Sequence, residues 1–303
     1  MHPRFTGPYT FGHVPLSRSL DGVDVAFVGV PFDTAAGFRV GGRFGPSAIR
    51  AGSIRLREYN EFLDVAPFDV LNCIDLGDVQ VLPGVTEESL ARIKTALDPV
   101  VDAGVVPFML GGDHSCTLAH LRAVAKDGPV AVIDFDAHTD AAMQIMGLRY
   151  SHGTWMRRAI EEGLVDVSRS VEIGLRGPSG GPTERTELRD ELGLEYFTAE
   201  DVFDLGSKAV GQRVRDRVGD GPVFVSVDID VLDPSHAPGT GTTEIGGLTT
   251  RDAMVIVRSF AGLSVVGADV MEVIPAYDVA ELTTNAAAGI AYELLCVIAL
   301  APN

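Results

Sequence analysis

The sequence is short of basic side chains. Its 303 residues include 24 lysines and arginines against 42 aspartates and glutamates, which gives a formal net charge of −18 at pH 7. A protein that binds nucleic acid normally presents a basic face, and no cluster of Lys or Arg occurs in this chain. We therefore expect no nucleic-acid partner. The acidic excess serves solubility and adds a mild attraction for cationic small molecules.

Cysteine is also scarce. The three cysteines, Cys73, Cys116 and Cys296, are odd in number, far apart and set in apolar segments, so we expect no disulfide framework. This pattern is typical of a reducing compartment, and it predicts a cytoplasmic protein. Long hydrophobic runs are missing as well. The first residues contain no apolar segment of the kind found in a secretory signal. The most apolar stretch, 286–300, carries Tyr and Glu and is too polar for a membrane span, which predicts no membrane partner.

What the chain does contain is an alternation of short apolar runs and amphipathic segments. Continuous apolarity is typical of strands that are buried on both faces of a parallel sheet. The predicted strands are 25–30, 105–110, 130–135, 171–175, 223–229 and 265–270. The predicted helices are 87–101, 115–126, 154–162, 207–218, 250–260 and 285–300. The alternation predicts an α/β protein with helices on both faces of one sheet.

No internal repeat and no Pro/Ser-rich linker divides the sequence, which indicates one large domain. Pro3, Pro8 and Pro15 exclude a long regular element at the start of the chain. We predict an N-terminal arm over residues 1–20 and a single domain over residues 21–303.

Acidic and histidine residues gather where three of the predicted strands end. In an open parallel sheet, ligands bind beyond the carboxyl ends of the strands. The residues at these ends are His114, Asp136, His138, Asp140, Asp228 and Asp230. A single strand-end aspartate would be interpreted as a cap, but carboxylates crowded to this degree are costly unless cations neutralise them. The pattern therefore predicts a metal site.

The ligand types also indicate which metals would bind. Oxygen ligands with a minority of imidazole suit hard or borderline divalent cations, with Mn²⁺ ahead of Zn²⁺. The four aspartates carry four negative charges, which two divalent ions would cancel. Two-metal centres supply a hydroxide at neutral pH and stabilise developing negative charge. The residues alone thus predict a dinuclear metallohydrolase.

Two further residues belong to the candidate site. His152 lies in a predicted loop after Asp140, where it could carry a proton to a leaving group; a surface histidine is the alternative interpretation. Glu272 ends the last apolar run, where its carboxylate could bind a planar cation; a strand-end ion pair is the alternative. Asp113 is interpreted as a helix cap outside the metal ligands.

The chain resembles the ureohydrolase family, which comprises arginases, agmatinases, guanidino-acid hydrolases and proclavaminate amidinohydrolase. The resemblance rests on Gly-Gly-Asp-His at 111–114, Asp-Ala-His-Thr-Asp at 136–140 and Ser-Val-Asp-Ile-Asp at 226–230. Further similar segments cover nearly the whole chain. The resemblance implies a three-layer α/β/α fold with a parallel sheet of about eight strands, so that residues 21–303 form the catalytic domain.

The resemblance also implies two Mn²⁺ ions per chain, with Ni²⁺ and Co²⁺ left open. One ion would be held by His114, Asp136, Asp140 and Asp228. The other would be held by Asp136, His138, Asp228 and Asp230. His152 would be the proton shuttle and Glu272 the carboxylate that receives the guanidinium. A dinuclear phosphohydrolase or a metal-stabilised scaffold explains this set of residues less well.

The implied reaction releases urea and an amine from a small cationic guanidino substrate. Arginases carry Asn- and Ser-bearing segments where this chain has the mostly apolar, Asn-free segment 141–150, which argues against arginase. We rank agmatine first, with putrescine and urea as products in polyamine biosynthesis. A guanidino acid comes second, either 4-guanidinobutyrate or a proclavaminate-type compound. Arg149 could pair with its carboxylate, although a solvent-facing arginine is the commoner explanation. Family members are commonly trimers or hexamers, which predicts a homo-oligomer.

Overall fold

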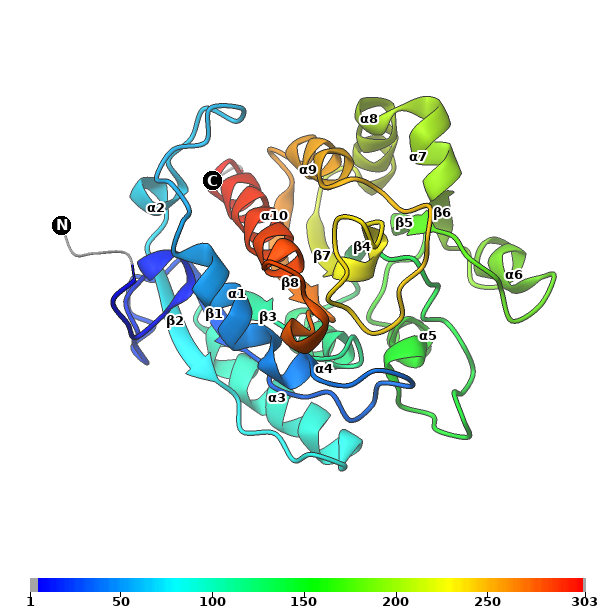
Figure 1. The fold of residues 1–303 in the computed structure, drawn as a ribbon, viewed down its shortest axis with the longest axis horizontal. Coiled ribbons are helices and arrows are strands. Elements are labelled where there is room, and N and C mark those ends of the chain that lie inside the picture. Colours follow the sequence, from blue (N-terminus) through cyan, green and yellow to red (C-terminus); the bar gives the residue numbers. More distant parts are fainter. Residues whose placement is uncertain (1–4, 302–303) are drawn as a thin grey trace.

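A single parallel sheet forms the centre of the protein (Figure 1). The computed structural model describes residues 5–301, without the side chain of Glu184. The eight strands follow the order β2-β1-β3-β8-β7-β4-β5-β6. Their bounds are β1 Val25–Gly29, β2 Cys73–Asp78, β3 Val106–Leu110, β4 Ala131–Phe135, β5 Val171–Leu175, β6 Glu195–Thr198, β7 Pro222–Asp228 and β8 Ser264–Met271. The predicted α/β class with about eight parallel strands is confirmed.

Helices cover both faces of the sheet. The α-helices are α1 Gly45–Ser53, α2 Pro67–Val70, α3 Thr86–Asp102, α4 Cys116–Val124, α5 Trp155–Glu161, α6 Glu184–Asp190, α7 Ala199–Leu205, α8 Ser207–Val218, α9 Thr250–Arg258 and α10 Leu282–Ala299. Short 3-10 turns occur at η1 Phe11–His13, η2 Gly42–Phe44, η3 His152–Thr154, η4 Ile229–Val231 and η5 Pro275–Tyr277. One core cluster joins the sheet to α1, α8, α9 and α10, and a second joins it to α3, α4 and α5. These two cores produce the three layers.

The C-terminal helix α10 is the element most easily mistaken for a membrane span. Among the described residues it is the one helix long and apolar enough to cross a membrane. However, 78% of its most apolar window is buried inside the protein, and the helix contacts α1, α9 and β8. Its composition is that of a core helix enclosed by its own chain.

The predicted N-terminal arm packs against the sheet over the part that the structure describes. Phe11 is fully buried, and its ring stacks on Phe27 of β1 with the centroids 4.3 Å apart. The backbone N–H of Phe11 donates to Asp75 Oδ2 of β2 at 3.0 Å. Residues 1–4 of the arm lie outside the described residues, and the division at residue 20 stays a prediction.

The order of the strands decides where the polar clusters meet. Because every strand pair is parallel, all carboxyl ends lie along one edge of the sheet. Strands β3, β8, β7 and β4 are adjacent in the middle of the sheet. The predicted metal ligands and Glu272 lie at the ends of these four strands and in the loops that follow them, so residues far apart in the sequence come together there.

Candidate metal centre

The first predicted set of metal ligands lies together behind the pocket at the sheet edge. His114 Nδ1 is 3.1 Å from Asp136 Oδ2, 3.1 Å from Asp140 Oδ2 and 3.4 Å from Asp228 Oδ2. All four side chains are buried. One imidazole nitrogen therefore faces three carboxylate oxygens, which is the donor set that the sequence predicts for one ion.

The second set is centred on His138. Its Nδ1 lies 3.1 Å from Asp230 Oδ2 and 3.4 Å from Asp136 Oδ1. Asp136 thus turns one oxygen to each histidine, as a carboxylate that bridges two cations does. Asp228 directs Oδ2 to the first set, while its Oδ1 accepts the backbone N–H of Asp230 at 2.8 Å. That Asp228 also binds the second ion stays a prediction.

The electrostatics of the cluster favour bound cations. Burial, followed by the charge of Asp136, raises the pKa of Asp140 to about 6. Burial and the neighbouring charges of Asp230 and Asp136 raise the pKa of Asp228 well above its usual range. Burial also disfavours the charge of Asp136, but hydrogen bonds from His114 and His138 outweigh this and lower its pKa. Divalent ions would hold all these carboxylates ionised, and the oxygen-rich donor set fits Mn²⁺ or a similar ion.

A buried hydrogen-bond chain orients the His114 ring from behind. Its Nε2 lies 2.9 Å from Ser226 Oγ, and that hydroxyl donates to Asp269 Oδ1 at 2.6 Å. Asp269 Oδ2 is in turn paired with Thr117 Oγ1 and His120 Nδ1, each at 3.1 Å. When Ser226 donates to Asp269, its oxygen accepts the Nε2–H of His114, which leaves the Nδ1 lone pair facing the carboxylates.

Sequence reasoning missed this chain, although it held one usable signal. Ser226 precedes Asp228 by two positions on β7, so both side chains lie on one face of that strand. Trp155 is a second supporting residue that no sequence motif marks. Its Nε1–H donates to Asp140 Oδ2 at 2.9 Å, and its ring lies 4.8 Å from that of His114. Trp155 therefore packs in the core and fixes one candidate ligand.

His152 and Glu272 lie in direct contact beside the first set. The distance from His152 Nδ1 to Glu272 Oε1 is 3.3 Å, and the same oxygen accepts the backbone N–H of His114 at 2.9 Å. Glu272 adopts a left-handed conformation with φ 61°, which is strained for a residue with a side chain. The backbone N–H of Gly37 faces His152 Nε2 at 2.9 Å, and Nε2 accepts it only while the ring is neutral. The sequence analysis identified both residues separately, and the structure brings them into contact. Their roles in the reaction stay predictions.

The ionisation of His152 depends mainly on that contact. Burial lowers the pKa of His152, but the hydrogen bond and charge of Glu272 outweigh it and raise the pKa to about 9. The predicted cap role of Asp113 is wrong, because Ser115 is the N-cap of α4 and no side chain caps that helix; the Asp113 carboxylate instead accepts the backbone N–H groups of Ala35 and Ser115. Burial and the charge of Glu272 raise the pKa of Asp113 to about 7.

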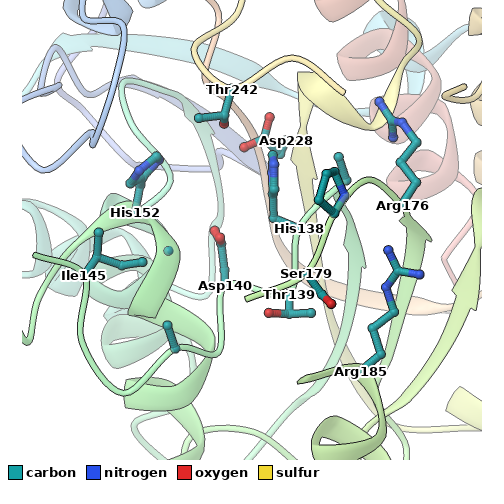
Figure 2. A pocket seen from close by; sticks show the side chains of 14 residues that line it. His138, Thr139, Asp140, Ile145, His152, Arg176, Ser179, Arg185, Asp228 and Thr242 are labelled. Carbon is teal, nitrogen blue, oxygen red and sulfur yellow. The ribbon is translucent and has the colours of Figure 1, made fainter. Parts of the chain in front are cut away.

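A cavity of about 220 Å³ opens over the centre. Figure 2 shows His152 and Ile145 on one side of it, Arg176 and Arg185 on the other, and predicted metal ligands between them. The sequence suggested Arg149 as partner of a substrate carboxylate, and the structure places that side chain elsewhere. Arg149 is 63% exposed, pairs with Glu161 at 2.9 Å and does not line the cavity.

Comparison with known proteins decides the family. The profile of the arginase family matches residues 23–296. The chain belongs to the arginase family. It is 46% identical to the mitochondrial agmatinase of Gallus gallus, over 94% of this chain and 84% of that protein. It is 43% identical to the guanidinobutyrase of Pseudomonas aeruginosa, over 98% of this chain and 94% of that protein.

The fold comparison agrees with the sequence comparison. The structure of proclavaminate amidinohydrolase from Streptomyces clavuligerus matches with a TM-score of 0.92 at 38% identity, covering 99% of this chain and 100% of that one. The predicted family, the arginase-like fold and the expectation of a ureohydrolase enzyme are confirmed. Within this arginase-family member, the pocket over the buried histidine–carboxylate cluster is the candidate active site.

Proposed function

We propose that the protein hydrolyses the guanidino group of a small linear compound to urea and an amine at a two-metal centre. One observation carries this proposal. Two histidine–carboxylate donor sets share Asp136 beneath a small pocket, and His152 and Glu272 lie beside them. Relatives that are an agmatinase and guanidino-acid hydrolases support the same reaction.

The residues that would hold the ions follow from the donor sets. His114, Asp136, Asp140 and Asp228 would bind one ion. Asp136, His138 and Asp230, together with Asp228, would bind the other. When bound, two such ions supply a hydroxide at neutral pH and stabilise negative charge that develops on the substrate. We propose Mn²⁺ as the natural metal, with Ni²⁺ and Co²⁺ as alternatives.

Glu272 and His152 are proposed to act on the substrate directly. Oε1 of Glu272 is occupied by His114 and His152, whereas its Oε2 faces Gly241, where an added Cβ would lie 3.5 Å away. A guanidinium would thus be received at Oε2. With a pKa of about 9, His152 carries a proton at neutral pH, held between its Nδ1 and Glu272 Oε1. We propose that this proton goes to the departing amine nitrogen.

The proposed substrate class has two members that differ at the end remote from the guanidino group. Agmatine, which ends in an ammonium, ranks first from the sequence, and the 46% identical relative is an agmatinase. Guanidino acids, which end in a carboxylate, are the second candidate. One observation favours this second candidate, because Arg185 lines the pocket.

A urea-release assay on the metal-loaded protein tests the reaction. We expect urea from agmatine or 4-guanidinobutyrate, and a kcat/KM for arginine that is at least about 100-fold lower than for the better substrate, because arginine would bury an unpaired charge. Absence of urea with every guanidino compound, while two metal ions are bound, would overturn the proposal.

The setting of this reaction is proposed as well. We propose a cytoplasmic homo-oligomer of three or six chains. Large apolar side chains exposed around the site loops support an interface, among them Phe38, Met146, Ile245 and Val279. Light scattering that finds a particle of 32.1 kDa alone would contradict the oligomer.

A further inference from the structure

Two arginines form one wall of the candidate active site. Arg176 and Arg185 lie on the opposite side of the pocket from His152 (Figure 2). Both come from the segment after β5, since Arg176 directly follows the strand and Arg185 lies in α6. A pocket expected to take a cationic guanidino compound therefore has positive charge on one of its walls.

The guanidinium of Arg176 hydrogen-bonds to backbone carbonyl groups. Its guanidinium donates to the carbonyl oxygens of residues 174, 230, 231, 232 and 244 at 2.5 to 3.2 Å. These bonds tie the loops after β5 and β7 together. Arg176 therefore shapes the wall, and it has little capacity left for a ligand.

Arg185 has the opposite arrangement. Its Nη2 donates to the carbonyl oxygen of Gly177 at 2.8 Å, and the rest of its guanidinium is left for another partner. Among the side chains that the structure describes, which do not include that of Glu184, no carboxylate lies within ion-pair distance of it. Two other arginines near the site do pair with carboxylates, since Arg43 bonds Asp33 and Arg149 bonds Glu161. Arg185 is half-buried and lines the pocket like Arg176, but it has one hydrogen bond to the backbone where Arg176 has six, so most of its donors are left for a ligand.

The acids around the pocket leave no obvious receptor for an ammonium. The two carboxylates that line it, Asp140 and Asp228, both belong to the candidate metal cluster. Glu244 is the nearest alternative. It lies against Gly177, with Oε1 4.0 Å from His138 Nε2, and it does not line the pocket.

We propose that Arg185 binds the carboxylate at the far end of the substrate, so that this enzyme acts on guanidino acids in preference to agmatine. The inference rests on the proposed function, because it assumes that the guanidino group lies at the metal cluster. Arginine donors bind carboxylates through charge-assisted, bidentate hydrogen bonds. The ammonium of agmatine would instead meet a like charge at Arg185.

The test compares 4-guanidinobutyrate and agmatine, which differ mainly in the charge of one end. We expect the Mn²⁺-loaded wild type to favour 4-guanidinobutyrate in kcat/KM by about tenfold or more. Arg185→Gln should lower kcat/KM for 4-guanidinobutyrate by about 10- to 100-fold, chiefly through KM, and change agmatine hydrolysis by less than about threefold. Arg185→Lys keeps the charge and should retain part of the preference.

Matched variants separate Arg185 from its rivals. Arg149→Gln removes an exposed arginine outside the pocket and should leave both substrates unchanged. Glu244→Gln should also leave the ratio of the two substrates unchanged. A selective loss of agmatine hydrolysis in Glu244→Gln, without an effect of Arg185→Gln, would overturn the inference. Circular dichroism and metal content verify the fold of each variant.

A binding readout covers the case in which Arg185→Gln folds poorly. The product 4-aminobutyrate should inhibit the wild type more strongly than Arg185→Lys, whereas putrescine should inhibit both alike. Urea release with an unchanged substrate ratio in both Arg185 variants overturns the role of Arg185 and leaves the proposed reaction standing. No urea from either compound, with two metals bound, overturns the proposed reaction and this inference with it.

Discussion

Asp136 is the residue on which both donor sets depend. Its two carboxylate oxygens face different histidines, His114 and His138. Asp136→Asn replaces one of these oxygens by an amide nitrogen that binds cations poorly. We expect bound metal to fall from two ions per chain to fewer than one, and activity to fall by at least about 100-fold. Elemental analysis and urea release measure the two effects.

Asp113→Asn is the matched control for that prediction. Asp113 is equally buried and only one residue from His114, but its carboxylate bonds the backbone N–H groups of Ala35 and Ser115. Its substitution should leave the metal content near two ions per chain. Two metals retained in the Asp136→Asn protein would contradict the bridging role.

The proposed role of His152 as the proton donor can be tested by substitution and by pH. His152→Ala should lower kcat by about 10² to 10⁴, as expected for loss of a general acid, while both metal ions stay bound. Glu272 raises the pKa of His152 to about 9, and a general acid acts in its protonated form. The kcat of the wild type should therefore fall as the pH rises through about 9, and the variant should lose that decline. Loss of metal in His152→Ala would mean that the residue is a ligand instead.

At the scale of the elements, the central strands were predictable and the edge strands were not. Strands such as β4 and β7 are buried on both faces and read as continuous apolar runs. The edge strand β6 is half-buried throughout, and β2 contains Asp75 and Asp78. Helix α1 was missed because it opens with Gly45 and Pro46, which are typical of turns.

The same distinction explains how much of the site could be predicted. The candidate ligands lie in short local motifs at strand ends, so spacing alone could identify them. The buried support depends on strand register, which local sequence does not reveal. Ser226 of β7 pairs with Asp269 of β8, and Asp134 of β4 pairs with Glu172 of β5. Arg185 was missed for the same reason, because it reaches the pocket only through the fold of the segment after β5.

The β4–β5 pair carries a stability prediction. Glu172 is fully buried, and neither of its oxygens has a hydrogen-bond partner among the described residues. Burial, followed by the charge of Asp134, raises the pKa of Glu172 well above its usual range. A carboxyl whose pKa is raised in the folded state lowers stability as the pH rises above its unfolded value, by at most about 1.4 kcal/mol per pH unit.

Glu172→Gln removes this titration. We therefore expect the melting temperature of the variant to exceed that of the wild type by an amount that grows from pH 5 to pH 9. Glu200→Gln, which changes an exposed glutamate of α7, should give a curve parallel to the wild type. Parallel curves for Glu172→Gln would mean that Glu172 has a partner that stabilises its charge.

At the scale of the whole molecule, the net charge and the charge inside the pocket favour different substrates. The net charge of −18 mildly favours the dication agmatine over a guanidino acid. Fields of exposed charges are screened beyond roughly 8–10 Å in physiological salt, whereas a group inside the pocket acts at contact distance. Arg185 therefore outweighs the net charge in selecting the far end of a substrate. Whole-chain charge predicts solubility better than it predicts specificity.

The last prediction concerns metal removal, which affects the stability of the entire fold. Without cations, only bound protons reduce the negative charge of the cluster. Burial raises the pKa of Asp140 to about 6. Burial lowers the pKa of His114, but the carboxylates bonded to His114 outweigh this and raise it well above its usual range. Because both pKa values are raised, the metal-free protein binds more protons folded than unfolded, and its stability falls as the pH rises through these values.

Bound metal replaces those protons, so its stabilising effect should be larger at pH 8 than at pH 5. At a metal concentration of 100 times Kd, binding contributes about 2.7 kcal/mol, which for a chain of 303 residues corresponds to a rise in melting temperature of roughly 4 °C. Calorimetry with and without a chelator at both pH values measures the difference, and Asp136→Asn is the control in which the chelator should have little effect. An equal shift at pH 5 and pH 8 would mean that protons do not substitute for the metal, and that the buried carboxylates are compensated by groups outside the cluster.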